Sequence, residues 1–359
     1  FDLIQYKEGF LLMGFARSET NVPSRPIQQE KMYKAFTDYL AFNHIIDVRN
    51  VGELNNAVKA RRTADLINVA EALHEKYIGR ISDEITKRYH EGGARIVLIA
   101  GPSSSGKTTT TKRLAIQLMT NLLKPQMISL DDYFVNRDRT PLDENGEYDY
   151  ESLYALDLKR FNDDLNAILD GNEVELPSYN FELGQRVNRG NKIKLEEGSI
   201  LLIEGIHGLN PELTAHIEER MKYRVYVSAL TTLSIDDHNW IPTTDNRLLR
   251  RIIRDYKYRG TSATDTIARW TSVRAGEEKW IFPYQENADA TFNSSLIFEL
   301  GVMREVGESI LRGVPRDKAE YAVAYRLRKF LSYFSPISMN LLPSTSLLRE
   351  FMGGSSFHY

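Results

Sequence analysis

Hydrophobic residues in this chain recur in two patterns, and each pattern predicts a different kind of element. Short runs that are apolar throughout are typical of the buried strands of a parallel sheet. Such runs occupy residues 95–100, 126–130, 199–203 and 223–227, and a fifth candidate covers 296–298. Stretches with helical character separate most of these runs, at residues 107–122, 157–170, 211–221 and 245–258. Strands and helices that alternate in this way predict an α/β fold, with a parallel sheet flanked by helices.

The two flanks of this region have patterns of their own. Two short apolar segments on either side of Lys7-Glu8-Gly9 predict a hairpin over residues 1–13, and a short helix is expected over 28–42. From residue 61 to 89, apolar side chains recur at spacings of three and four, which predicts a helix that ends at Gly92-Gly93. The tail over 315–359 is predicted to be mostly helical and then rich in glycine and serine.

Composition and charge narrow the classes of protein that fit. The chain has 359 residues, of which 42% are hydrophobic and 26% charged, as in ordinary globular proteins. Lys and Arg number 46 against 49 for Asp and Glu, so the net charge of −3 disfavours a strongly basic nucleic-acid-binding protein. The absence of cysteine excludes disulfides, thiolate metal sites and cysteine nucleophiles, and it fits a reducing, cytoplasmic location. No apolar run approaches the roughly 20 residues that a membrane helix needs.

The strongest motif lies directly after the first predicted strand of the sheet. Residues 101–108 have the sequence Gly-Pro-Ser-Ser-Ser-Gly-Lys-Thr, which matches the phosphate-binding loop G-x-x-x-x-G-K-[ST] in full. The glycines let the backbone turn its N–H groups toward phosphates, and the following helix adds unpaired donors. Lys107 supplies a positive charge, and Thr108 offers a hydroxyl to Mg²⁺. The motif indicates a nucleoside triphosphate without separating a kinase from a GTPase or a motor.

Two carboxylates follow predicted strands at the edge of the sheet where ligands bind. Asp131 follows the run at 126–130, and Glu204 follows the run at 199–203. A kinase that acts on a hydroxyl needs a base near the acceptor and a carboxylate near the metal. We expect Asp131 to be the base and Glu204 to bind Mg²⁺ with Thr108. A helix cap or turn is the alternative role for Asp131.

A predicted amphipathic helix over 245–255 carries a stripe of arginines. Arg247, Arg250, Arg251 and Arg254 share one arc at roughly 100° per residue, opposite leucines and isoleucines. Such a stripe could hold the transferred phosphoryl group, because arginine presents a fixed fork of donors. In isolation, a solvated face with surface ion pairs is the better interpretation, and the overall charge disfavours a nucleic-acid contact. Basic character continues into a candidate lid at Arg269, Arg274 and Lys279.

Taken in order, these motifs resemble the uridine kinase and phosphoribulokinase family of P-loop kinases over roughly residues 94–300. The family's catalytic-aspartate segment resembles 129–134, its metal-carboxylate strand resembles 202–205, and its arginine helix resembles 247–255. Its ribose-contacting aspartate resembles Asp149, and its nucleoside segment resembles 177–181. The resemblance implies ATP-dependent phosphorylation of a hydroxyl, specifically the 5′-hydroxyl of uridine or cytidine.

The resemblance also implies roles for individual residues. The expected catalytic residues are Asp131, Lys107 and Arg254. ATP is expected to contact Gly101, Ser103, Ser104, Ser105, Gly106, Lys107, Thr108, Thr109, Arg254 and Arg259. Mg²⁺ is expected at Thr108 and Glu204, and the acceptor at Asp149, Tyr179, Phe181 and Arg251.

Some positions depart from the family pattern. Asn180 stands where the family usually has aspartate, and Thr261 stands where it often has arginine. The region 270–284 also differs from that of simple uridine kinases. Because these differences fall mainly on acceptor contacts, phosphoryl transfer is better supported than uridine as the acceptor. Two alternatives therefore stay open: a P-loop kinase for another small hydroxyl compound, and a nucleotide-sensing regulatory protein whose N-terminal part contacts RNA.

The pattern along the chain, with its helix stop at Gly92-Gly93, and the extent of the resemblance together divide the chain into domains. We expect a small α+β N-terminal domain over 1–60, a connecting helix over 61–93, a P-loop kinase domain over 94–305 and a helical extension over 306–359. The chain begins at Phe1 rather than at a methionine, so we expect the first domain to be truncated. Residues 1–90 and the tail over 347–355 lie outside a minimal uridine kinase and resemble a longer bacterial subgroup, in which an N-terminal region similar to part of threonyl-tRNA synthetase precedes the kinase domain. A small-molecule acceptor is the expected partner, and an oligomer remains open.

Overall fold

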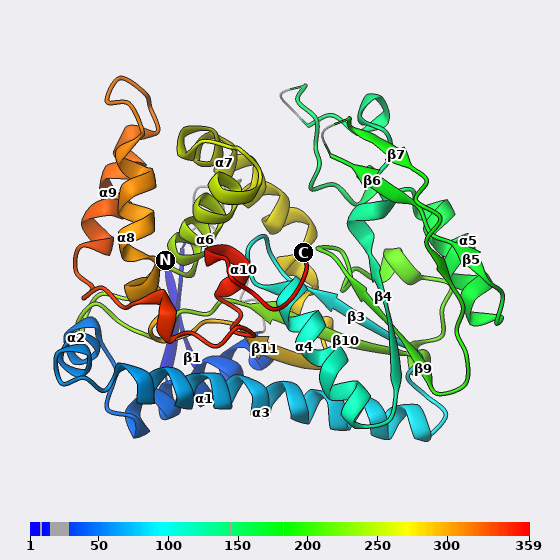
Figure 1. Cartoon of the computed structure of the whole chain (residues 1–359), viewed down its shortest axis with the longest axis horizontal. Coiled ribbons are helices and arrows are strands. Elements are labelled where there is room, and N and C mark those ends of the chain that lie inside the picture. The colour runs from blue at the N-terminus through cyan, green and yellow to red at the C-terminus, as the bar shows by residue number, and fades with distance from the viewer. Residues whose placement is uncertain (8, 15–28, 144–145, 182) are drawn as a thin grey trace.

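A five-stranded parallel sheet lies at the centre of the computed structural model, which describes residues 1–7, 9–14, 29–143, 146–181 and 183–359 (Figure 1). The strand order is β11-β10-β3-β9-β4, and every neighbouring pair is parallel. These strands are β3 (Ile96–Ala100), β4 (Lys124–Ser129), β9 (Ser199–Glu204), β10 (Lys222–Ser228) and β11 (Ala290–Asn293). The predicted α/β fold is confirmed.

Helices cover both faces of this sheet, as a buried parallel sheet requires. Successive side chains of a strand point to opposite faces, so Val97 and Ile99 belong to one core cluster and Ile96 and Leu98 to another. The first cluster contains residues of α3 (Thr63–His90), α4 (Lys107–Thr120) and α8 (Glu299–Arg312). The second contains residues of α5 (Leu158–Leu169). This two-sided burial explains why the strands are apolar throughout.

The remaining elements surround this core. The helices are α1 (Glu30–Ile45), α2 (Val51–Lys59), α6 (Thr243–Tyr258), α7 (Ala263–Trp280), α9 (Tyr321–Leu331) and α10 (Arg349–Met352). Short strands form two further hairpin-like pairs, β5 (Val174–Glu175) with β8 (Lys192–Ile193) and β6 (Ser178–Asn180) with β7 (Gln185–Val187). The 3₁₀ turns are η1 (Leu130–Tyr133), η2 (Arg137–Arg139), η3 (Leu153–Ala155), η4 (Pro211–Thr214), η5 (Glu219–Met221), η6 (Phe282–Asn287) and η7 (Met339–Leu341).

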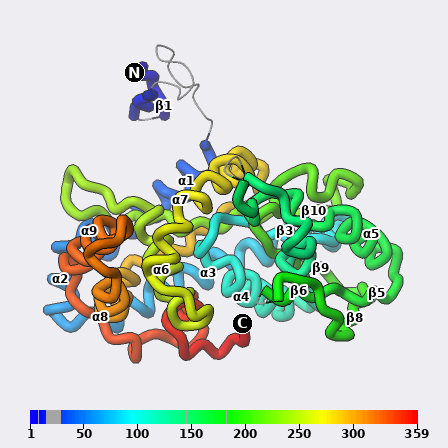
Figure 2. Tube along the Cα trace, turned by 90° about the horizontal axis from the view of Figure 1, so that it is seen from above, coloured from blue at the N-terminus to red at the C-terminus, as the bar shows by residue number. Residues whose placement is uncertain are grey.

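The hairpin and the short helix predicted near the N-terminus are confirmed for the described residues. An antiparallel hairpin of β1 (Asp2–Tyr6) and β2 (Gly9–Met13) stands out from the body of the molecule (Figure 2). Lys7 Nζ lies 3.1 Å from Glu30 Oε1 at the start of α1. The helix predicted over 28–42 corresponds to α1, although residue 28 lies outside the described residues. The helix predicted over 61–89 is α3, which packs into the main core rather than serving only as a connection.

Two predicted elements are wrong. The fifth strand is β11 at residues 290–293, whereas 296–298 forms the turn into α8, where Glu299 Oε1 accepts from the Leu296 N–H at 3.2 Å. No α-helix forms over 211–221, which contains η4 and η5 instead. In this segment the Glu219 carboxylate forms ion pairs with Lys222 and Arg224 of β10. These pairs tie the end of the segment to the strand that comes next. The apolar run at 296–298 and the helical character of 211–221 both led to wrong predictions, because such short signals do not distinguish turns from regular strands and helices.

Candidate active site

The phosphate loop joins β3 to α4 and has the backbone that its sequence predicts. Gly106 adopts a left-handed conformation, with φ +84°, immediately before the first residue of α4. At Gly101, an added Cβ would lie 2.0 Å from the Val227 carbonyl oxygen, so any side chain would collide with β10. The glycines are therefore required by a tight turn and by a close approach to the neighbouring strand.

Two buried arginines of α6 donate hydrogen bonds to backbone carbonyls of the phosphate loop. Arg247 Nη1 donates to the Ser103 carbonyl at 3.0 Å, and Arg250 Nη1 donates to the Ser104 carbonyl at 3.4 Å. Arg247 also pairs with the buried Glu277 of α7. A trans peptide places its N–H opposite its carbonyl, so binding the Ser103 carbonyl turns the Ser104 N–H away from α6. The solvated arginine face, which was the better interpretation in isolation, is wrong for Arg247 and Arg250, which are 1% and 0% exposed.

Lys107, Thr108 and Glu204 meet where β3 and β9 end. Lys107 Nζ donates to the carbonyls of Gly101 and Pro102 at 3.0 and 3.2 Å, and Thr108 Oγ1 donates to Glu204 Oε1 at 2.9 Å. Burial raises the pKa of Glu204 to about 7, although the nearby Lys107 opposes the shift. Glu204 Oε2 is buried and has no hydrogen-bond partner among the described residues. A hydroxyl beside a carboxylate with one free oxygen fits the ligand preference of Mg²⁺.

Asp131 lies in η1, directly after β4, at the same edge of the sheet. Asp131 is an exposed residue, but desolvation of its carboxylate by the surrounding protein raises its pKa. Lys107, Arg259 and Arg254 act in the opposite direction, so these three cations lie near the carboxylate. Arg251 Nη1 donates to Ser103 Oγ at 2.8 Å. The structure thus brings Asp131 together with the phosphate loop and the outer arginines of α6.

Aromatic rings gather beside η1, the turn that carries Asp131. The rings of Tyr179 and Phe181 lie 5.0 Å apart by their centroids, and the ring of Phe134 lies within 6.1 Å of both. Tyr179 is buried, whereas Phe181 is 59% exposed. Asp149 Oδ1 accepts from the Glu151 N–H at 3.1 Å, so part of this carboxylate stabilises its own turn. The exposed ring of Phe181 can contact a ligand, and Asp149 Oδ2 takes no part in the hydrogen bond to Glu151.

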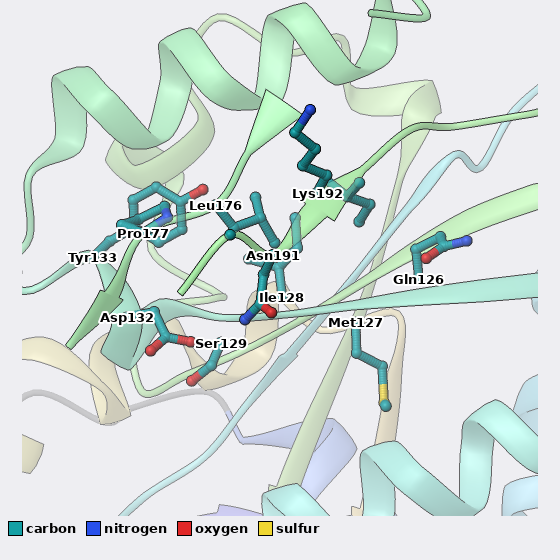
Figure 3. Close-up of a pocket in the computed structure, with 12 residues that line it drawn as sticks. Gln126, Met127, Ile128, Ser129, Asp132, Tyr133, Leu176, Pro177, Asn191 and Lys192 are labelled. Atoms are coloured by element: carbon teal, nitrogen blue, oxygen red, sulfur yellow. The ribbon is translucent and has the colours of Figure 1, made fainter. Parts of the chain in front are cut away.

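A cavity of about 440 Å³ lies next to this cluster. It is lined by residues 126–129 of the edge strand β4, by Asp132 and Tyr133 of η1, and by residues 176–177 and 190–193 (Figure 3). Asp132 Oδ1 accepts from the Tyr179 N–H at 3.1 Å, which ties η1 to β6. No phosphate-loop residue lines the cavity, so it adjoins the candidate acceptor region without reaching the donor region.

Three carboxylates near the phosphate loop were not predicted from the sequence. Glu277 accepts from the Ser103 N–H at 3.1 Å and neutralises Arg247. Burial raises the pKa of Glu151 to about 7, and Arg251 and Lys107 act on it in the opposite direction. Glu350 Oε2 accepts from the Thr109 N–H at 3.2 Å. None of the three follows a strand or belongs to a motif, and Glu350 lies 241 residues from its partner.

A parallel sheet, a phosphate loop between its central strand and a helix, and a carboxylate beside the loop's threonine define a P-loop nucleotide-binding protein. The family model described as the Phosphoribulokinase / Uridine kinase family matches residues 96–297. The chain therefore belongs to this family of P-loop kinases, which transfer a phosphoryl group from ATP to an alcohol. Within the described residues, the helices are all too short or too polar to cross a membrane.

Relatives described as uridine kinases match about half of the chain. A uridine kinase of Halobacterium salinarum is 28% identical over 53% of this chain and 76% of its own length. A uridine kinase of Macrococcus caseolyticus is 28% identical over 54% of this chain and 85% of its own length. Among solved structures, D-glycerate 3-kinase from Cryptococcus neoformans var. grubii is similar, with a TM-score of 0.33 and 13% identity over 79% of this chain and 90% of that one. The family assignment rests on the sequence relationships.

Proposed function

We propose that this protein transfers the γ-phosphoryl group of ATP to a hydroxyl of a nucleoside similar to uridine or cytidine. The observation that carries the proposal is the meeting of Lys107, the Thr108–Glu204 pair and Asp131 at the carboxyl ends of three adjacent strands. A charge for the phosphates, oxygen ligands for a metal and a base are the parts that phosphoryl transfer to an alcohol requires.

The donor's phosphates would lie on the N–H groups of the phosphate loop. Lys107 Nζ, now on two loop carbonyls, would move to the phosphate oxygens, which offer it a full negative charge. Burial lowers the pKa of Lys107, and Glu204 and Asp131 raise it. Arg251, Arg254 and Arg259 would neutralise charge that develops on the transferred group.

The metal-binding residues would be Thr108, through its hydroxyl, and Glu204, through the oxygen that has no hydrogen-bond partner in the described part of the chain. Mg²⁺ bound there would withdraw charge from the phosphate oxygens. Glu204 itself must be ionised to bind a cation, and a cation beside it favours that form.

Asp131 would accept the proton of the attacking hydroxyl or orient that hydroxyl toward the phosphorus. A raised pKa suits this role, because a stronger base takes the proton more readily near neutral pH. Positioning the hydroxyl and the phosphoryl group in line would supply much of the rate.

The acceptor would bind between Asp131 and the rings of Tyr179 and Phe181. The exposed ring of Phe181 provides a flat apolar face, on which a nucleobase can stack. Asp149 would contact the ribose. The relatives described as uridine kinases support the same class of acceptor.

The acceptor is tested with a panel of nucleosides and other small alcohols, with ATP as donor and release of ADP as the signal. We expect turnover with a pyrimidine nucleoside. Turnover with another alcohol and with none of the nucleosides would replace the acceptor and keep the phosphoryl transfer. Asn180, which stands where the family usually has aspartate, is the observation that makes this second outcome a real alternative. ATP binding without any turnover would instead support the regulatory alternative.

A further inference from the structure

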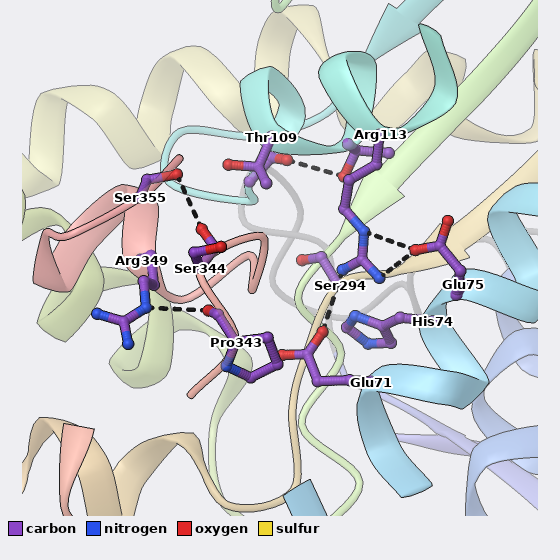
Figure 4. Close-up of polar contacts among 12 residues, drawn as sticks. Glu71, His74, Glu75, Thr109, Arg113, Ser294, Pro343, Ser344, Arg349 and Ser355 are labelled. Carbon is purple, nitrogen blue, oxygen red and sulfur yellow. Dashed lines mark hydrogen bonds and ion pairs between the residues drawn. The ribbon is translucent and has the colours of Figure 1, made fainter. Parts of the chain in front are cut away.

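The C-terminal strap, defined as residues 343–359, lies against the phosphate loop and the first turn of α4 (Figure 4). Leu347 is fully buried, and a Cβ added to Gly106 would come within 2.7 Å of its Cδ2. Arg349 Nε donates to the Pro343 carbonyl at 2.9 Å, which braces the turn that leads into α10. The backbone of α10 is thereby held next to the loop.

This packing places the Glu350 carboxylate on the start of α4. Glu350 Oε2 accepts from the Thr109 N–H at 3.2 Å and from Thr109 Oγ1 at 2.6 Å. The Tyr359 hydroxyl lies 2.8 Å from the same Oγ1. Thr109 is the third residue of α4, and the N–H groups of a helix's first turn have no partner within the helix. The Glu350 carboxylate therefore accepts a hydrogen bond from an N–H group that the helix leaves available to an anion.

A bound nucleotide would need the same Thr109 N–H group. Backbone N–H groups of the phosphate loop and of the first helical turn cradle the α- and β-phosphates. A phosphate oxygen cannot take the Thr109 N–H while Glu350 holds it, and two adjacent anions repel each other. We propose that Glu350 is an internal competitor of the donor nucleotide, whose carboxylate fills this anion position in the free protein and is displaced when a nucleotide binds. The proposal rests on the proposed function only in taking the loop as the donor site.

The charges around Lys107 agree with a competitor. Glu204, Asp131 and Glu350 all act electrostatically on this lysine. Each carboxylate offsets part of the positive charge that would attract a polyphosphate. Glu204 and Asp131 have roles in the proposed reaction, whereas Glu350 has none there. Moving Glu350 away leaves Lys107 more positive toward the incoming phosphates, so the strap lowers nucleotide affinity until the carboxylate leaves.

The test is calorimetric titration of the full chain with ADP and Mg²⁺, for wild type, Glu350→Gln and Glu350→Ala. Glu197→Gln is the matched control, because this exposed carboxylate precedes β9 at the opposite end of the sheet. Removing the competing charge is expected to lower the Kd of ADP about tenfold or more in both Glu350 variants. The control is expected to bind as wild type does.

Other results would overturn the proposal. Equal affinity in wild type and both Glu350 variants would show that the carboxylate does not compete. Weaker binding in both variants would show that Glu350 supports the nucleotide. If ADP binds to wild type, either result leaves the proposed function intact. If ADP binds to none of the four proteins, the donor site itself is wrong, and the proposed function fails together with this inference.

Discussion

Replacing Glu277 with glutamine tests whether the buried ion pair beneath the phosphate loop holds the fold together. The Glu277 side chain is 0% exposed and the Arg247 side chain 2% exposed, and Arg247 Nη2 lies 2.7 Å from Glu277 Oε2. Glutamine keeps the size of the side chain and one acceptor, but it leaves the Arg247 charge buried without a counter-charge. Breaking a buried pair in this way costs about 3–5 kcal/mol.

Glu278→Gln is the control for this substitution, one residue further along the same helix. Glu278 is 48% exposed and lies 3.4 Å from Arg274. An exposed pair of this kind contributes below about 1 kcal/mol. The two variants thus lose the same formal charge from neighbouring positions, one buried against Arg247 and the phosphate loop and the other exposed.

Urea denaturation followed by circular dichroism measures both effects as free energies of unfolding. We expect Glu277→Gln to lose about 3 kcal/mol or more and Glu278→Gln to stay close to wild type. Equal losses in the two variants would refute the reasoning, because they would show that burial of the pair has no special energetic weight.

Two further predictions concern pH and the acceptor. Burial raises the pKa of Glu151 from 4.5 to about 7. At a pH between these two values, Glu151 is protonated in the folded chain and ionised in the unfolded chain. Wild-type stability should therefore fall as pH rises through that window, and Glu151→Gln should show a smaller fall in the urea midpoint; an identical pH profile would contradict this assignment. Phe181→Ala should raise the KM of the accepted nucleoside about fivefold or more, since stacking contributes about 1–3 kcal/mol. Steady-state kinetics should show an unchanged KM for ATP, and an unchanged KM for the nucleoside would argue against stacking on Phe181.

The fold and the place of the phosphate loop within it could be predicted well because their signals are local. The phosphate loop is a contiguous motif, and Glu204 directly follows a strand whose neighbours end at the same edge of the sheet. Those features need no knowledge of distant contacts. An unbroken apolar run in the sequence also predicts a buried parallel strand, as at β3 and β9.

The parts that could not be predicted depend on contacts between distant segments. Helical periodicity placed Arg247 and Arg251 on one arc, but it could not show that Glu277 of another helix would bury the first and leave the second beside Ser103. Glu350 shows the same limit more strongly, because only the packing of the strap brings it to Thr109. The pattern of charged residues along one segment does not show which residue of a distant segment will pair with them in the folded chain.

The most direct test of the central claim compares Asp131→Asn with Asp132→Asn. The two carboxylates are adjacent, but Asp131 faces Lys107 and the outer arginines, whereas Asp132 accepts from the Tyr179 N–H, which asparagine can also do. The measurement is the rate of phosphoryl transfer from ATP to the accepted alcohol, with the Kd of ADP determined in parallel. We predict that Asp131→Asn loses transfer by about 100-fold or more, as expected for a catalytic base, keeps its affinity for ADP, and is far slower than Asp132→Asn. Equal transfer rates in wild type and Asp131→Asn would contradict the account.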